Sequence, residues 1–418
     1  MNFCSNQRER EQMIKMKKVS PEKIENNSIP IFSMIMFAFF PTSFQKEIGG
    51  NLYIIVLWLI LTAFVLTVFI RNAVDTGKLR LVIFILLYMC GVSMIQMYTN
   101  KWARISIARI APLVVLLLTL TIVVKKIPDF SVMERLTDIF SATCIIWNVG
   151  ILLQFSPVVD FTKNFYSQYY DRALHYSMLY KKPVMGFGVH TFAAFYYFLM
   201  FICYYGLAQK RHKIKDYLLC FVYICFTALL TSNSSLIYTA VMLCMYVWLI
   251  RKKVFVILSV VCAGILILYQ NSEWILHNYM IFLRDGKSGF QGRYVGSNTF
   301  LENFEVIKSS LGIGFCILDN KNIIYSDSGY VMYLTMGGII LLVLLYSLII
   351  LFVRDNIPKM YRLPMIFLIM SFEVALPGTF SYRFVFALVF AVCFFQSLEK
   401  QALDAQMIYP PNMCRLRC

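Results

Sequence analysis

Uncharged apolar runs of membrane-spanning length recur along almost the whole chain. Residues 51–70 form a run of twenty positions without a charge, and residues 254–270 and 329–353 have the same character. A hydrocarbon core about 30 Å thick requires roughly 20 residues of helix. These runs are continuous, whereas the strands of an outer-membrane barrel alternate between apolar and polar residues. The sequence therefore predicts an all-α, polytopic integral membrane protein.

The composition agrees with this fold class. Of the 418 residues, 59% are hydrophobic and only 15% are charged, which is far from the average of soluble domains. The runs predict a single transmembrane domain over residues 29–397, between a basic N-terminal segment (1–28) and a C-terminal tail (398–418). Within this domain we expect twelve spans, near residues 29–45, 51–70, 81–98, 107–124, 138–155, 185–208, 217–231, 235–250, 254–270, 329–353, 361–377 and 380–397.

The basic residues predict how the chain is oriented. When the loops are assigned to alternate sides, 25 of the 39 Lys and Arg residues fall on the side that holds both termini. Most of them lie in short loops, where the positive-inside rule applies, so both termini are predicted to be cytoplasmic. The net charge of +17 is then a signal of topology, and no nucleic-acid partner is expected.

Sequence signatures of metal and cofactor sites are missing. The twelve cysteines are scattered, mostly within predicted spans, and no CxxC pair occurs. Neither a disulfide framework nor a zinc site is therefore expected. There is no Walker loop and no dinucleotide-binding fingerprint. We expect neither a bound metal nor a cofactor.

Two loops on the predicted outer side, 156–184 and 271–328, are long enough to hold a site. The second contains FQGRY (290–294) and SSLGIGF (309–315), and YSDSGYVMYLTMGGI (325–339) runs from it into the next span. Long loops in compact proteins are usually functional or disordered, and the aromatic content here argues against disorder. Transporters usually keep their chemistry near the bilayer midplane. These loops instead indicate a reaction at the membrane surface on a lipid-anchored substrate.

The pattern of residues 155–345 resembles a family of membrane glycosyltransferases. Arg293 lies in GRY about twenty residues before Gly312-x-Gly314, and a polar Ser-Asp-Ser stretch and a span with Gly337-Gly338 follow. Upstream, KKPVMGFGVHTFAAFYYFLMF (181–201) places basic residues and glycine before a helix rich in small and aromatic residues. With the span count and the outer loops, this pattern resembles bacterial O-antigen and capsule polysaccharide polymerases and the related O-antigen ligases.

This resemblance implies a GT-C-like fold and a metal-independent glycosyl transfer. The enzyme would join undecaprenyl-pyrophosphate-linked oligosaccharide repeats at the outer face of the bacterial inner membrane. A repeat-unit flippase and a chain-length regulator in the same membrane are the implied protein partners.

Such a substrate needs cations, because the pyrophosphate leaving group carries several negative charges. Arginine binds two phosphate oxygens with a planar fork, so Arg293 is the first candidate for this role. Arg172 is the second. The other predicted substrate-binding residues are Lys181, Lys182, Arg284, His190 and Tyr294.

A carboxylate or histidine near the acceptor hydroxyl would serve as general base. Asp327 is the first candidate, because it occupies the stretch where the resembled ligases carry a histidine. That departure favours a polymerase over a ligase and leaves the identity of the base open. Glu305 and His190 are the alternatives.

Each candidate also has a structural interpretation. Arg293 would then bind lipid headgroups, and Lys181 and Lys182 would anchor a helix at the membrane interface. Asp327 would cap the helix that starts at Gly329.

Three further ionisable residues lie in or near spans, close to the predicted outer face. These residues are Arg109, Glu373 and Arg383. We expect them to pair with one another; the alternative is that they line an outer substrate cavity.

The sequence leaves other functions open. An O-antigen ligase would transfer the finished glycan to lipid A-core, and a flippase would move lipid-linked oligosaccharide across the membrane. The flippase predicts charges along a central pathway and internal repeats, neither of which the sequence shows. A nonenzymatic subunit of a polysaccharide assembly complex is a third alternative.

Overall fold

The structure is a computed structural model that describes residues 21–39, 59–68, 72–165, 178–187, 190–251, 273, 311–318, 328–376 and 378–408. Most of these residues are helical. The helices are α2 (Pro21–Phe39), a short apolar helix (Leu59–Val68), α4 (Thr76–Thr99), α5 (Ile107–Leu120), α6 (Phe130–Leu152), α7 (Ser156–Phe165), α9 (His190–Arg211), α10 (Ile214–Leu229), α11 (Asn233–Ile250), α15 (Gly329–Asn356), α16 (Lys359–Ala375), the 3-10 turn η1 (Gly378–Phe380) and α17 (Tyr382–Ile408). The short strands are β1 (Ala73–Val74), β2 (Ala103–Ile105), β3 (Ile122–Val123) and β4 (Cys316–Leu318).

Five of the described helices are long and apolar enough to cross a membrane, namely Thr76–Thr99, Phe130–Leu152, His190–Arg211, Gly329–Asn356 and Arg383–Asp404. The outermost of them expose large apolar side chains. On α4, for example, Leu87 is 67% and Met94 71% exposed. Exposure of such a surface to water is unfavourable in free energy, whereas contact with lipid tails is not. The architecture is therefore compatible with the predicted all-α membrane protein.

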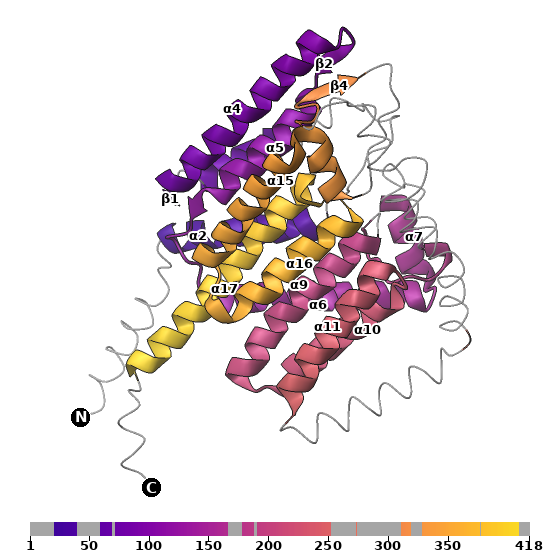
Figure 1. The fold of residues 1–418 in the computed structure, drawn as a ribbon. Helices are drawn as coiled ribbons and strands as arrows, with labels where there is room; N and C mark the ends of the chain where they lie inside the picture. Colours follow the sequence, from indigo (N-terminus) through magenta and orange to yellow (C-terminus); the bar gives the residue numbers. More distant parts are fainter. Residues whose placement is uncertain are drawn as a thin grey trace, which may run out of the picture.

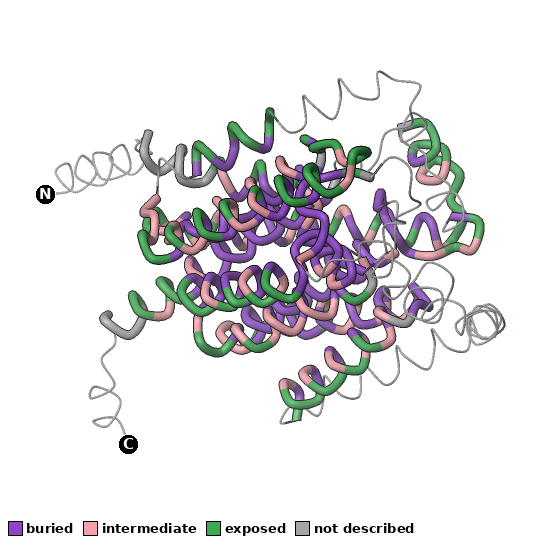
Figure 2. The backbone as a smooth tube through the Cα atoms, turned by 45° about the horizontal axis from the view of Figure 1, so that its top comes forward, coloured by how far each residue is buried: buried purple, intermediate pink, exposed green. Residues whose placement is uncertain are grey.

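Helix α9 forms the centre of the bundle. Its apolar window is entirely buried, and α10, α11, α16 and α17 all contact it. A helix that is apolar on every side has to be enclosed by protein or lipid, and the run from Thr191 to Ala208 has this character. Figure 1 shows α9 between α16 and the α10–α11 pair, and Figure 2 shows how buried residues concentrate in the middle of the bundle.

Most predicted span boundaries lie within a few residues of the observed helix ends. The polar turn at 231–235 joins α10 and α11, and Ser232 and Ser235 form a capping box there, so the predicted helical hairpin is confirmed. Helix α6 begins at Phe130, before the predicted 138–155 span, and Glu134 in its early turns forms an ion pair with Arg211. Helix α17 continues to Ile408, past the predicted end at 397. The predicted span 254–270 lies outside the described residues.

At one end of the bundle, short segments that were predicted to be cytoplasmic contact one another. Strand β1 pairs antiparallel with β3, which lies at the end of the predicted span 107–124, so helix α5 ends earlier than predicted, at Leu120. Lys78 at the start of α4 forms an ion pair of 2.7 Å with Asp355 at the end of α15. Arg211 at the end of α9 bridges Glu134 of α6 and the buried Asp216 of α10.

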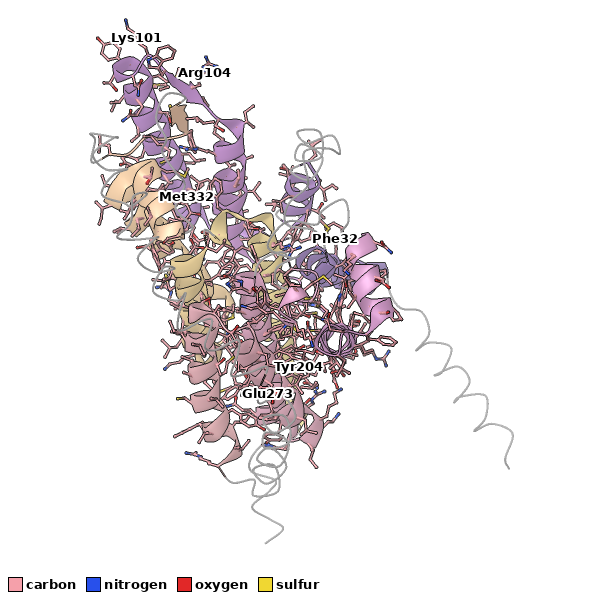
Figure 3. The ribbon with its side chains drawn as sticks, turned by 90° about the vertical axis from the view of Figure 1, so that its right-hand side faces the viewer. Phe32, Lys101, Arg104, Tyr204, Glu273 and Met332 are labelled. Atoms are coloured by element: carbon pink, nitrogen blue, oxygen red, sulfur yellow. The ribbon has the colours of Figure 1, made fainter. Side chains whose placement is uncertain are left out.

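The opposite end joins segments that were predicted to lie outside. Strand β2, between α4 and α5, pairs antiparallel with β4, so that Arg104 lies opposite Ile317. Figure 3 labels Lys101 and Arg104 at the projecting tip that α4 and β2 form. At each end, these contacts therefore bring together loops that were predicted to lie on the same side of the membrane. Which end faces the cytoplasm stays a prediction.

Candidate functional site

Six of the nine predicted site residues lie outside the described part of the chain, namely Arg172, Arg284, Arg293, Tyr294, Glu305 and Asp327. Lys181, Lys182 and His190 are described. They belong to the segment that leads from the first predicted outer loop into the central helix α9.

This segment, residues 178–187, is held to α6 and α9 by a buried polar network. Asn148 of α6 donates to the Tyr197 hydroxyl (2.7 Å) and accepts from the Met185 amide (3.0 Å). The Tyr197 hydroxyl in turn donates to the Pro183 carbonyl. The network fixes the backbone directly after the two lysines, so their positions relative to the bundle are set.

The two lysines have different surroundings. Lys181 is exposed and has a left-handed backbone conformation (φ 53°). Lys182 is half-buried, and this burial lowers the pKa of its ammonium group. A partly desolvated cation is stabilised by a nearby anion. Lys182 therefore suits a phosphate contact better than Lys181, and His190 follows at the start of α9, also half-buried.

The glycine pairs singled out in the sequence lie against each other. Helix α15 departs from helical geometry at Gly337 (φ −142°, ψ 22°) and Gly338 (φ 61°, ψ −164°). Just before this break, the Thr335 carbonyl accepts from the Ile313 amide (2.9 Å) and the Met336 carbonyl accepts from the Gly314 amide (2.7 Å). The Gly312-x-Gly314 segment therefore docks, backbone to backbone, on the broken helix.

Side chains of α4 and α5 hold this docked segment from the other side. The Phe315 amide donates to Ser93 Oγ (2.9 Å), and Gln96 Nε2 donates to the Gly312 carbonyl (3.0 Å). Arg109 of α5, which is 5% exposed, donates to the Cys316 carbonyl. These bonds pair backbone groups of a buried segment that would otherwise lack partners.

The fit leaves no room for a side chain at Gly314. This residue has φ +63°, and a Cβ built on it would lie 2.7 Å from the Ser93 backbone nitrogen. Glycine is therefore required there for both its backbone conformation and its size.

A buried carboxylate organises the neighbouring α16–α17 hairpin. Glu373 is fully buried and accepts from the Thr379 amide (2.6 Å) and the Tyr346 hydroxyl (3.2 Å). The Tyr333 hydroxyl shares a 2.7 Å hydrogen bond with the Thr379 hydroxyl. This network ties the 3-10 turn η1 to both halves of the broken helix α15.

The expected pairing of Arg109, Glu373 and Arg383 with one another is wrong among the described contacts. Arg109 binds the Cys316 carbonyl, and the Glu373 carboxylate is held by hydrogen bonds rather than by an ion pair with Arg383. The fully buried Arg383 guanidinium lies over the Phe187 ring at 4.9 Å and over Phe192 at 5.7 Å. Helix α17 is thereby linked to the segment that carries Lys181 and Lys182.

Asp327 lies outside the described residues, so its capping interpretation stays a prediction. The N-cap of α15 is Ser328, one residue later (φ −103°, ψ 128°). Its hydroxyl donates to the Glu373 carbonyl (3.3 Å). Ser328, the residue directly after the candidate base Asp327, is thus bonded to α16.

Sequence reasoning missed Tyr88, Ser93 and Gln96. Ser93 and Gln96 are buried polar residues three positions apart in the predicted 81–98 span, and they line the same helix face as Met89. The Tyr88 hydroxyl donates to the Gly337 carbonyl (2.9 Å), directly at the break in α15. Polar side chains within an apolar span are costly and mark interior contacts. This signal was present in the sequence.

A small pocket lies elsewhere. It is lined by residues of α2, α5, α15 and α17, with Asn72, Thr119 and Lys126 as its polar members. These residues adjoin strands β1 and β3, so the pocket is at the end of the bundle opposite Gly312 and Gly314. Across the described ranges, no three His, Cys, Asp or Glu side chains come together in a group that could hold a metal ion.

Comparisons with protein-family models, with curated proteins and with solved structures found no match for this chain. The geometry of the described residues is therefore the only structural support for the candidate site. The described residues build a scaffold that brings the end of the second predicted outer loop to α4, α5 and α15, and the end of the first to α6, α9 and α17.

Proposed function

We propose that this protein is a polysaccharide polymerase of the bacterial inner membrane. It joins undecaprenyl-pyrophosphate-linked oligosaccharide repeats at the outer face. The observation that carries the proposal is the contact between Gly312-x-Gly314 and the Gly337-Gly338 break in α15. Two elements of the sequence pattern, 25 residues apart, are joined in one backbone structure, as parts of a single site would be.

In the proposed reaction, cations bind the pyrophosphate while the sugar–phosphate bond breaks. Arg293 has the first role, because a guanidinium neutralises the developing charge and binds two oxygens at once. Arg172, Lys182 and Arg284 support it, and Asp327 takes the proton of the attacking hydroxyl, with Glu305 and His190 as alternatives. Each transfer forms one glycosidic bond and releases the lipid pyrophosphate, without a metal.

This role assigns partners to the protein. A flippase supplies the lipid-linked repeats from the cytoplasmic side, and a chain-length regulator limits the number of transfers. The broad apolar exterior of α4 and α6 suits lateral approach of a polyprenyl lipid through the bilayer, since Leu87 and Ile146 are each more than 60% exposed.

A second candidate is a lipid-linked oligosaccharide transporter. The broken helix α15 favours it, because transporters commonly build their substrate sites from discontinuous helices. In α15, however, the two freed carbonyls before the break are occupied by loop amides. They are therefore unavailable to a substrate in this conformation.

Glycan profiling of a deletion strain separates these functions. A polymerase predicts the loss of long chains while single repeats still reach the cell surface. Repeats trapped inside the cell would instead show a transporter, and full-length glycan left on its lipid carrier would show a ligase. Complementation with the wild-type chain must restore the normal length distribution.

A further inference from the structure

The break in α15 coincides with the place where the loop docks, and we infer that docking of residues 311–316 and bending of α15 are one two-state element. The Thr335 and Met336 carbonyls are the link. They accept from the amides of Ile313 and Gly314 at 2.9 and 2.7 Å.

The backbone bonds of a regular helix explain why the two events are coupled. In an unbroken α-helix, the carbonyls of residues 335 and 336 would accept from the amides of residues 339 and 340. Thr335 and Met336 are both buried, and buried backbone groups need a partner in either case. A bent helix with a docked segment satisfies both carbonyls, and so does a straight helix with a released segment. A bent helix with a released segment leaves the two carbonyls unpaired, and a straight helix with a docked segment leaves the amides of Ile313 and Gly314 without acceptors, so both mixed states are disfavoured.

Four side chains of α4 and α5 stabilise the docked state. Tyr88 donates to the Gly337 carbonyl at the break, and Ser93 and Gln96 bond the backbone on either side of Gly314. Arg109 binds the Cys316 carbonyl, at the start of β4. These residues act on the position of the loop through its backbone, so they are positioning residues.

Both halves of the element extend beyond the break. The docked segment belongs to the 271–328 loop. The first part of α15 carries Tyr333, which bonds Thr379, and its N-cap residue Ser328 bonds the Glu373 carbonyl. A change at Gly337-Gly338 is therefore transmitted to the α16–α17 hairpin. The coupling of docking and bending is a conformational property, and its test does not depend on the proposed reaction.

The first experiment perturbs the helix and observes the loop. Gly338 has φ 61° and ψ −164°, a conformation open essentially to glycine alone, so Gly338→Ala favours the straight helix. Native Cys316 is buried in the docked segment and reports its release. In the purified full-length protein, its alkylation by N-ethylmaleimide should accelerate roughly tenfold, as expected if a minor state rises from about 1% to 10%.

Two internal references make this result decisive. Cys203, fully buried in the central helix α9, should stay protected in site-resolved mass spectrometry. Gly91→Ala is the matched control, because a Cβ at Gly91 meets nothing within 4 Å. An unchanged Cys316 rate in Gly338→Ala, with Cys203 protected, overturns the inference. If Cys203 also becomes reactive, Gly338→Ala has disturbed the fold as a whole. The Ser93→Ala/Gln96→Ala variant is then tested in its place, by comparing the alkylation rates of Cys316 and Cys203.

The second experiment perturbs the loop and observes the helix. Gly314→Ala places a methyl group against Ser93 and should release the segment. Spin labels at Leu334 and Ile350, introduced as unnatural amino acids, measure the helix across the break. Their distance should shift toward the value of a straight helix, about 24 Å for sixteen residues. Release of Cys316 without this shift would show that the loop moves independently of the bend, and would overturn the coupling.

Discussion

The proposed chemistry depends most strongly on one side chain, Arg293. Arg293→Ala should abolish polymer while the protein still accumulates at the wild-type level, and Arg293→Lys should restore activity only partly because an ammonium lacks the planar fork. Loss of a charge-assisted contact in a dehydrated site costs about 3–4 kcal/mol, so turnover should fall roughly 10²–10³-fold. Glycan length on gels is the measurement.

Arg251 provides the matched control. It stacks on the exposed Trp248 at the end of α11, so Arg251→Ala removes an arginine without touching the candidate site. Near-normal chain lengths in Arg293→Ala, at wild-type protein levels, would place the pyrophosphate site elsewhere, with Arg172 as the next residue to test.

Asn148 should matter for stability. Its side chain satisfies the buried Met185 amide and the Tyr197 hydroxyl. Asn148→Ala leaves the Met185 amide unpaired, at a cost of about 1–3 kcal/mol, and removes one of the two hydrogen bonds of the Tyr197 hydroxyl, which still donates to the Pro183 carbonyl. Thermal unfolding of the purified protein in detergent should show a lower midpoint. Thr143→Ala, an exposed change on the same helix, should have little effect, and equal midpoints for the two variants would contradict the role of the network.

At the scale of elements, the pairing of β2 with β4 is directly testable. Arg104 and Ile317 lie opposite each other and are both exposed, so cysteines at these two positions should form a disulfide under mild oxidation. The pair Lys125→Cys and Ile317→Cys is the control, because Lys125 adjoins β3 at the other end of the bundle. Cross-linking of the control pair, or none in the test pair, would contradict the observed register.

The sequence anticipates elements where local pattern determines structure. The uniform apolar run of 185–208 predicts an enclosed span, and α9 is the buried centre of the bundle. The polar turn at 231–235 predicts a hairpin that the capping box completes. The apolar run 329–353 contains a Gly337-Gly338 pair that permits a kink, but its periodicity does not show which segment docks there, because the bonding of Thr335 and Met336 to the loop is long-range. Local pattern contains no information about that partner.

The candidate site shows the same limit. Gly312, Gly314, Gly337 and Gly338 stand out in the sequence, but their mutual contact depends on tertiary packing. Charge alone suggested that Glu373 and Arg383 would pair, whereas the Glu373 carboxylate accepts hydrogen bonds from the Thr379 amide and from the Tyr346 hydroxyl of α15. Arg293 and Asp327 lie outside the described residues, so their roles stay predictions.

For the whole molecule, the orientation in the membrane is the prediction to check. The excess of basic residues places Lys210 in the cytoplasm and Arg293 outside. Single cysteines at these positions, in a cysteine-free background, should differ in labelling by a membrane-impermeant maleimide on intact spheroplasts. Only the Arg293→Cys protein should react before lysis. Labelling of both positions from the same side would refute the topology.

The central claim is that this chain alone performs polymerisation at the membrane surface. The most direct measurement is a reconstitution of the purified protein in proteoliposomes with undecaprenyl-pyrophosphate-linked repeats, in the presence of EDTA. We predict a ladder of lengthening glycans on gels, formed without nucleotide or metal and lost with Arg293→Ala. Movement of the lipid-linked repeats across the bilayer without any change in their length would contradict the account and show a transporter.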